Sequence, residues 1–113
     1  MATMEKAILI LTNMPDVQSA HALARQLVEL KLAACVNILP GVQSVYRWQG
    51  ENEEANEITV MIKTTHARYA EIESAIKGNH PYQVPEIIAL PIVEALPDYL
   101  DWIAQETKKD VNV

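Results

Sequence analysis

Residues 33–65 constrain the fold of this chain more than any other stretch. They form two runs rich in Val, Ile, Thr, Tyr and Trp on either side of an acidic, glycine-containing tip at residues 50–56. Branched and aromatic side chains fit the half-buried surface of a sheet, so the runs predict a β-hairpin. Arms of about a dozen residues would reach about 40 Å, far beyond the usual strand of about 5–6 residues. A domain of this size cannot cover such a hairpin alone, which predicts that another chain covers part of it.

The two arms of the predicted hairpin suit different positions in a sheet. Pro40 interrupts the first arm, and because proline cannot donate a ladder hydrogen bond, we expect a bent strand at a sheet edge. Tyr46 and Trp48 share one face of that arm, and we interpret them as anchors against neighbouring chains. The return arm alternates apolar and polar residues from Glu57 to Thr64 without Pro or Gly, which favours a central strand packed on one face.

The segments before the hairpin predict one strand and one helix. Residues 6–11 form a short, mostly apolar run, which is typical of a buried strand. Asp16 is expected to cap a helix that closes around residues 30–32. Five apolar residues follow the spacing of one helix face: Ala20, Leu23, Ala24, Leu27 and Leu30.

After the hairpin, the pattern predicts a helix, a strand and a final helix. Thr64 or Thr65 is expected to cap the second helix, and Gly78 suits the left-handed position that ends it. Residues 87–93 predict a last strand, in which a proline indicates a sheet edge. Pro97 suits the first position of the third helix. The side chains expected to face inward on these helices are Tyr69, Ile72, Ile76, Leu96, Tyr99, Leu100 and Ile103.

The order of these elements predicts the fold class. Strand, helix, strand, strand, helix and strand make the α+β, ferredoxin-like βαββαβ arrangement with an antiparallel sheet, and the third helix extends its end. Two helices would cover one sheet face and leave the other without cover. Together with the long hairpin, this predicts a homo-oligomer. Residues 1–113 are read as one domain, with a frayed tail at about 108–113.

Composition excludes several classes of function. The net charge is −6, and Lys and Arg are scattered without the basic stripe that tracks a phosphate backbone, which argues against nucleic-acid binding. No apolar run approaches the roughly 20 residues that span a bilayer, so no membrane segment is expected. The start of the chain resembles a first strand more than a secretion signal. A single cysteine rules out an internal disulfide and suits a reducing cytoplasm.

Three side chains are the candidates for metal-binding chemistry. Cys35 is expected to be a small buried hydrophobe, with a soft metal ligand as the functional alternative. His80 follows a helix in a proline-rich loop, where it either bonds the last carbonyls of the helix or binds a ligand. Glu86 is placed to orient His80, to accept backbone N–H bonds or to face a neighbouring subunit. Chemistry is expected where the Cys35 end of the hairpin approaches the loop that carries His80 and Glu86.

The remaining polar and aromatic residues are expected to have structural rather than functional roles. His21 and His66 are expected to face solvent, and the glutamates of the hairpin tip are read as a solvated turn rather than a cation site. Tyr82 and Trp102 could line a pocket together with Tyr46 and Trp48, although core or interface packing is the favoured interpretation. No Gly-x-Ser-x-Gly, phosphate-binding loop or other catalytic motif is present, so the chain is not expected to be an enzyme.

Taken together, several motifs resemble the CutA family of divalent-cation tolerance proteins. They are LAACVNILPG at 32–41, SVYRWQG at 44–50, KTT at 63–65, HPYQVPE at 80–86 and YLDWI at 99–103. The resemblance runs from about residue 7 to residue 103. It implies a ferredoxin-like fold and a tight homotrimer formed through the long hairpins. It also implies an architecture like that of the trimeric PII signalling proteins and a link to copper and other divalent cations.

The resemblance leads to two hypotheses of function. Copper-binding members carry a cysteine and a His-His pair where this chain has Thr12 and Asn79-His80, so His80 and Cys35 are the remaining soft or borderline ligands. The first hypothesis is a metal-ion response protein that binds Cu²⁺ or another divalent cation weakly at an inter-subunit cleft, through His80 with Cys35 and Glu86. The second is a PII-like module that binds a small molecule or a partner protein.

Overall fold

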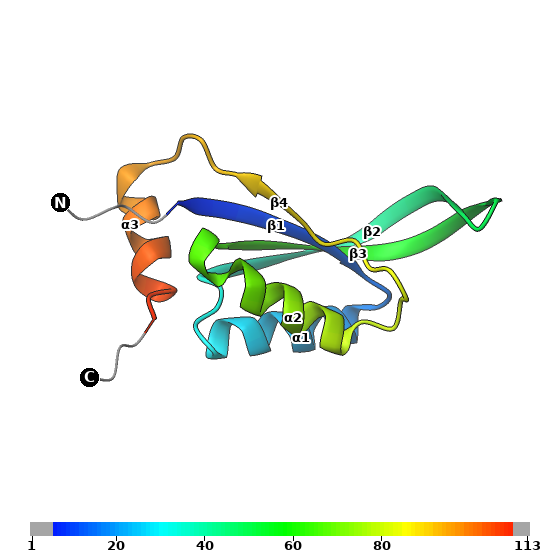
Figure 1. The fold of residues 1–113 in the computed structure, drawn as a ribbon, viewed down its shortest axis with the longest axis horizontal. Helices are drawn as coiled ribbons and strands as arrows, with labels where there is room; N and C mark the ends of the chain where they lie inside the picture. Colours follow the sequence, from blue (N-terminus) through cyan, green and yellow to red (C-terminus); the bar gives the residue numbers. More distant parts are fainter. Residues whose placement is uncertain (1–5, 110–113) are drawn as a thin grey trace.

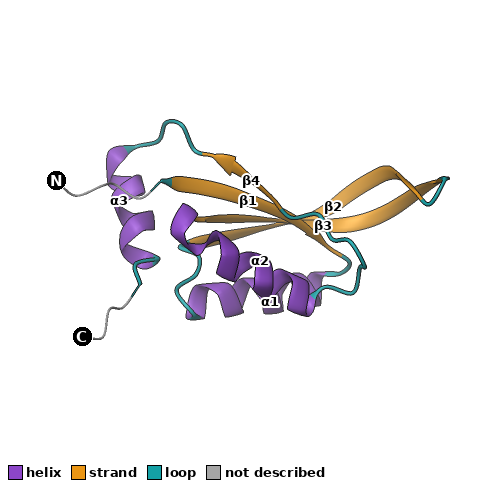
Figure 2. Cartoon of the chain, in the orientation of Figure 1, coloured by secondary structure: helices purple, strands orange, loops and turns teal. Residues whose placement is uncertain are grey.

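Residues 6–109 form a four-stranded antiparallel sheet with three α-helices (Figures 1 and 2). These are the residues that the structure, a computed structural model, describes. In chain order the elements are β1 (Ala7–Met14), α1 (Val17–Glu29), β2 (Cys35–Trp48), β3 (Glu51–Thr65), a 3₁₀ turn η1 (His66–Arg68), α2 (Tyr69–Asn79), β4 (Ile88–Pro91) and α3 (Pro97–Glu106).

The strand order β2-β3-β1-β4 is the ferredoxin-like order that the sequence predicts. Each neighbouring pair runs antiparallel. The two strands that contain proline, β2 and β4, occupy the edges, while β3 and β1 are central. Both edge assignments are therefore confirmed. Proline has no N–H to donate, and in an edge strand its nitrogen can face away from the neighbouring strand.

The helices α1 and α2 cover one face of the sheet, and α3 lies across one end (Figure 1). Asp16 caps α1 as expected, since its Oδ1 accepts a hydrogen bond from the Ser19 backbone N–H at 2.7 Å. The core lies between this helical layer and alternate residues of the central strands. Its fully buried members include Ile10, Met14, Ala20, Leu27, Val60, Ile62, Ile72 and Ile76.

The hairpin β2–β3 projects well beyond the rest of the sheet (Figure 1). β1 pairs with β3 only from Ile58 to Thr65, so residues 42–57 form a ribbon of two strands, which we call the distal hairpin. It gives the described chain its longest dimension, 52 Å against 29 and 23 Å. Val45, Tyr46 and Trp48 on it are 72%, 44% and 39% exposed. Residues 6–109 thus leave these apolar side chains partly uncovered, and a lone two-stranded ribbon is only marginally stable in water.

Two details of the hairpin refine the sequence interpretation. The bend at Pro40 is confirmed as a register shift between Leu39 and Val42, with Gly41 at a φ of 78°. The predicted acidic tip is wrong, because only Gln49 and Gly50 form the turn. Both have positive φ angles, 50° and 83°, as a tight hairpin turn requires. The acidic residues 51–56 belong to β3 and pair with β2, since a ribbon open to solvent accepts charged side chains without burying them.

The predicted ends of the first two helices differ from the observed ones. α1 stops at Glu29, which leaves Leu30 as its C-cap and 56% exposed instead of buried. α2 continues through Gly78 to Asn79, so Gly78 is not the left-handed cap. The Asn79 side chain closes this helix instead, since its Nδ2 donates to the carbonyl of Ala75 at 2.7 Å.

Other predicted boundaries also shift. β1 continues three residues beyond the predicted end, because its pairing with β3 extends to Met14 and the Asn13 side chain accepts a hydrogen bond from Thr59. β4 is shorter than the predicted strand at 87–93. Leu96 is 69% exposed as the N-cap of α3, whereas Ile103 is fully buried as expected. Thr65 precedes η1 without a capping side-chain bond.

Residues 108 and 109 follow α3 outside the helix, and residues 110–113 of the predicted tail lie outside the described residues. No helix of residues 6–109 is long and apolar enough to cross a membrane.

Two equally buried threonines on neighbouring strands differ in hydrogen bonding. Thr12 of β1 and Thr64 of β3 both have 0% exposure. Thr64 Oγ1 donates to the carbonyl of Leu32 at 2.6 Å. Thr12 Oγ1 has no hydrogen-bond partner within residues 6–109. A buried hydroxyl without a partner destabilises a fold by about 1–3 kcal/mol, so Thr12 is a weak point of the core.

The substitution Thr12→Val should raise the free energy of unfolding by about 1 kcal/mol, because valine keeps the shape and removes the unpaired hydroxyl. Thr64→Val is the matched control. The same change there breaks an existing bond and leaves the Leu32 carbonyl unpaired, so it should lower the stability by about 1 kcal/mol. Urea unfolding with unchanged m-values measures both effects. Equal losses in the two variants would contradict the assignment.

Candidate functional site

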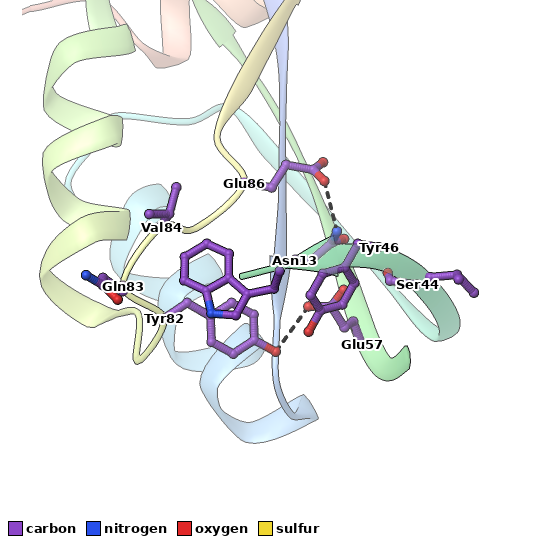
Figure 3. A pocket seen from close by; sticks show the side chains of 10 residues that line it. Asn13, Ser44, Tyr46, Glu57, Tyr82, Gln83, Val84 and Glu86 are labelled. Atoms are coloured by element: carbon purple, nitrogen blue, oxygen red, sulfur yellow. Dashed lines mark hydrogen bonds between the residues drawn. The ribbon is translucent and has the colours of Figure 1, made fainter. Parts of the chain in front are cut away.

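A cavity of about 550 Å³ lies where the distal hairpin leaves the sheet (Figure 3). Four segments line it: the end of β1, the outer parts of β2 and β3, and the loop between α2 and β4, residues 80–87. We call it the hairpin cavity. Its size falls within the range of about 300–1,000 Å³ typical of small-molecule sites. The lining side chains that carry its chemistry are Asn13, Tyr46, Trp48, Glu57, Tyr82 and Glu86.

The 80–87 loop is held against β1 by His80. Nε2 of His80 lies 2.6 Å from the carbonyl oxygen of Asn13, which can only accept a hydrogen bond, so Nε2 carries the proton. Nδ1 accepts a hydrogen bond from the backbone N–H of Tyr82 at 3.1 Å. The ring is therefore a neutral imidazole with both nitrogens engaged, and it also packs 4.6 Å from the Tyr82 ring between centroids. The alternative in which His80 bonds the last carbonyls of the helix is therefore wrong, because both of its ring nitrogens bond elsewhere and hold the loop in position.

Glu57 is a buried carboxylate in the cavity wall. It is only 6% exposed, and its Oε2 accepts a hydrogen bond from the Tyr82 hydroxyl at 3.2 Å (Figure 3). Within residues 6–109 the ion pairs both involve Glu71, far along the chain, so no cation balances Glu57. Burial, followed by the charge and the hydrogen bond of Glu57, raises the pKa of Tyr82 above its ordinary value.

Asn13 connects a second carboxylate to the sheet. Its Nδ2 donates to Oε1 of Glu86 at 3.2 Å (Figure 3). Its Oδ1 accepts a hydrogen bond from the Thr59 hydroxyl at 2.7 Å. Glu86 thus binds Asn13 and does not orient His80, so that one of the alternatives for Glu86 is wrong. The two carboxylates of the cavity are fixed by different partners, Tyr82 for Glu57 and Asn13 for Glu86.

The three predicted metal ligands do not meet in one chain. Cys35 lies opposite Lys63 on β3, whereas Asn13, which His80 contacts, lies opposite Thr59. Four residues of strand separate these positions, about 13 Å. The expectation that the Cys35 end of the hairpin approaches the His80 loop is therefore wrong within one subunit. No group of three or more His, Cys, Asp or Glu side chains suited to a metal ion occurs in residues 6–109.

The structure also places the other cysteine, histidine and aromatic residues that the sequence singles out. Cys35 is half-buried, and His21 and His66 are exposed as expected. Tyr46, Trp48 and Tyr82 line the same cavity, which was the less favoured interpretation of these aromatic residues. Trp102 lies elsewhere and packs on Tyr99, with ring centroids 5.5 Å apart.

Sequence reasoning missed Asn13 and the burial of Glu57. Asn13 reads as a loop residue after an apolar run, and only its contacts with Thr59 and Glu86 explain its place in a strand. Glu57 follows Glu51, Glu53 and Glu54 closely in the sequence, and the pattern predicts a solvated turn for all four glutamates. The one available signal was its position at the start of the alternating part of β3, where side chains become buried in turn.

Comparisons with known proteins agree with the fold. The model of the CutA1 divalent ion tolerance protein family matches residues 8–106. The Divalent-cation tolerance protein CutA of Thermus thermophilus is 47% identical over 104 residues, which cover 92% of this chain and 99% of that protein. Protein CutA of Mus musculus is 41% identical over 87% of this chain, which spans only 55% of that longer protein.

Solved structures give the same result. The crystal structure of CutA from Xylella fastidiosa matches with a TM-score of 0.88 and 42% identity, over 91% of this chain and 99% of that one. The crystal structure of CutA1 from Oryza sativa matches with a TM-score of 0.91 and 37% identity, over 96% and 100% of the two chains.

Glu57→Gln should lower the raised pKa of Tyr82 toward its ordinary value of about 10, because the substitution removes the charge that opposes ionisation, while burial, the largest cause of the raised pKa, remains. The NMR shift of the Tyr82 ring carbon Cζ, followed against pH, measures this. Glu86→Gln is the control, since Glu86 lines the same cavity without bonding Tyr82. An unchanged titration of Tyr82 in Glu57→Gln would contradict the assignment. The raised pKa of Tyr82 also makes the free energy of unfolding depend on pH. The stabilisation that comes from the protonated Tyr82 hydroxyl is fully present below the ordinary pKa of about 10, and it is lost as the pH rises through the raised pKa of the folded state.

Proposed function

This chain belongs to the CutA1 divalent ion tolerance family, and from that premise we propose that it acts in divalent-cation tolerance as a homotrimer. The observation that supports assembly is the distal hairpin, whose apolar residues lie exposed on a ribbon that no third strand of the chain supports. Tyr46 and Trp48 are the proposed interface anchors, since aromatic residues are enriched in such contacts. The proposal takes residues 1–113 as one domain with no role in nucleic-acid binding or catalysis.

The proposed metal function is weak binding of Cu²⁺ or another divalent cation at a cleft between subunits. His80, Cys35 and Glu86 are the proposed ligands. Nδ1 of His80 accepts the Tyr82 N–H, so a metal at this atom must first displace that hydrogen bond, which weakens the net affinity. Cys35 lies along the sheet from His80 within one chain, so a site that uses both needs residues from two subunits.

The proposed compartment is a reducing cytoplasm, which suits the single cysteine. Relatives differ in this respect. The Arabidopsis thaliana relative is named as chloroplastic, and the solved Archaeoglobus fulgidus relative is named as a periplasmic divalent cation tolerance protein.

A second candidate function is that of a PII-like module that binds a small molecule. The hairpin cavity favours it, because a cavity of about 550 Å³ with aromatic walls and a few fixed polar groups is typical of ligand sites. Its position at the root of the proposed assembly hairpin would place a bound molecule next to a subunit contact.

The protein should elute at three times the mass of its chain in size-exclusion chromatography with light scattering, and its unfolding midpoint should rise with protein concentration. Combining Tyr46→Ala with Trp48→Ala should shift the mass toward the monomer. Trp102→Ala is the control, because Trp102 is similarly exposed but lies on α3. A stable monomer at micromolar concentration would exclude the trimer, and an unaltered mass in the double variant would exclude these anchors.

Titration calorimetry with Cu²⁺ tests the metal proposal. His80→Ala should weaken binding by about tenfold or more, as expected for the loss of a ligand. His21→Ala is the matched control, since His21 is exposed on α1 and belongs to no proposed site. Unchanged affinity in a trimeric His80→Ala protein would exclude His80 as a ligand.

A further inference from the structure

We propose that the hairpin cavity binds a small organic cation that carries a substituted ammonium group. This inference rests on the second candidate function, a cavity for a small molecule, and names the class of its ligand. Three observations carry it: an unbalanced buried carboxylate, the aromatic rings around it, and a volume suited to a molecule rather than an ion.

The first observation is the charge of the cavity. Glu57 is 6% exposed and has one hydrogen-bond partner, the Tyr82 hydroxyl, within the part of the chain that the structure describes. Glu86 lies on the same cavity, and it too has no cationic side chain within ion-pair distance among residues 6–109. A carboxylate removed from water is costly unless an opposite charge or further hydrogen bonds compensate it. A cationic ligand would supply both to Glu57.

The second observation is the aromatic wall. Tyr46, Trp48 and Tyr82 come from two distant parts of the chain and line the cavity together with Glu57. The faces of aromatic rings attract cations, and substituted ammonium groups are bound in proteins by cages of such rings. Aromatic faces beside a carboxylate are therefore selective for a cation with apolar substituents, because a neutral molecule gains only the apolar contact.

The third observation separates an organic cation from a metal ion. A divalent cation such as Ca²⁺ or Mg²⁺ needs several oxygen ligands about 2.0–2.6 Å from one point. Glu57 and Glu86 are each held by a different partner, and residues 6–109 bring no third His, Cys, Asp or Glu to them as a metal-binding group. A volume of about 550 Å³ far exceeds that of one ion but accommodates a small molecule.

The proposed trimer is compatible with this ligand. Tyr46 and Trp48 line the cavity and are 44% and 39% exposed in the single chain, and we place the neighbouring subunit on the part of this surface that the ligand leaves uncovered. A subunit packed on that surface would shield the cavity from water, which strengthens the attraction between a cation and the aromatic faces.

The test uses choline as the cation and 3,3-dimethylbutan-1-ol as its neutral analogue of the same shape. In the trimeric Trp102→Phe protein, the remaining tryptophan, Trp48, reports binding through its fluorescence. Choline should change this signal in a saturable manner, and the neutral analogue should bind at least about tenfold more weakly, as expected when a charged interaction is lost. NMR shifts of Tyr82 provide a second readout that does not depend on Trp48.

Glu57→Gln should weaken choline binding by about tenfold while its amide oxygen can still accept the Tyr82 hydroxyl bond. Glu54→Gln is the matched control, because it removes the same charge from an exposed part of β3 outside the cavity, and its affinity should stay within about twofold. Equal binding of choline and its analogue, or an unchanged affinity in Glu57→Gln, would overturn the cation inference and leave the small-molecule module standing. Absence of choline binding at millimolar concentration would also overturn the cation inference, whereas the small-molecule function would fail only if the cavity also bound no ligand of another class. The mass and Cu²⁺ affinity of the wild-type protein are independent of all these outcomes.

Discussion

The structure depends on a mismatch in length between its two central strands. β3 has fifteen residues and β1 has eight, and the buried face of the sheet requires β1 to pair with the inner half of β3. The outer half then has β2 as its only neighbour. Alternation sets this register, because a slip by one residue would turn Ile58, Val60 and Ile62 away from the helices. The projecting hairpin is therefore a consequence of core packing in the inner sheet.

The same mismatch creates the cavity. Beyond the end of β1, β3 has no strand paired with it on that side. The loop from residue 80 to residue 87 passes beside this part of β3. Glu57 is the first residue of β3 beyond the paired region, which explains why a carboxylate is buried at a place where the sheet would otherwise continue. The Asn13 side chain connects β3 to the loop, because it bonds Thr59 on β3 and Glu86 on the loop. Polar residues are used here because the end of a strand leaves groups that a ladder can no longer satisfy.

The sequence predicts the parts of the fold that local patterns determine. Pro40 places β2 at an edge, and the capping carboxylate of Asp16 begins α1, because both effects act within a few residues. Patterns fail where a distant contact decides the outcome. The acidic residues after Gly50 resemble a loop, but pairing with β2 makes them a strand. The aromatic residues around the cavity could be proposed from the sequence. The burial of Glu57 and the role of Asn13 could not, because both depend on contacts with the loop between α2 and β4.

The two candidate functions share that loop, and this links them thermodynamically. His80 holds the loop through Asn13 and the Tyr82 N–H, and the Tyr82 hydroxyl in turn bonds Glu57 in the cavity. A metal ion that takes Nδ1 of His80 would release the backbone N–H of Tyr82, whereas an organic cation beside Glu57 would favour the position of Tyr82 seen in the structure. Coupling between two sites is reciprocal, so each ligand would lower the affinity for the other by the same factor. A weak metal ligand at His80 would thus still change the affinity for the second ligand, because the coupling depends on whether the His80–Tyr82 hydrogen bond is made and not on the absolute affinity for the metal.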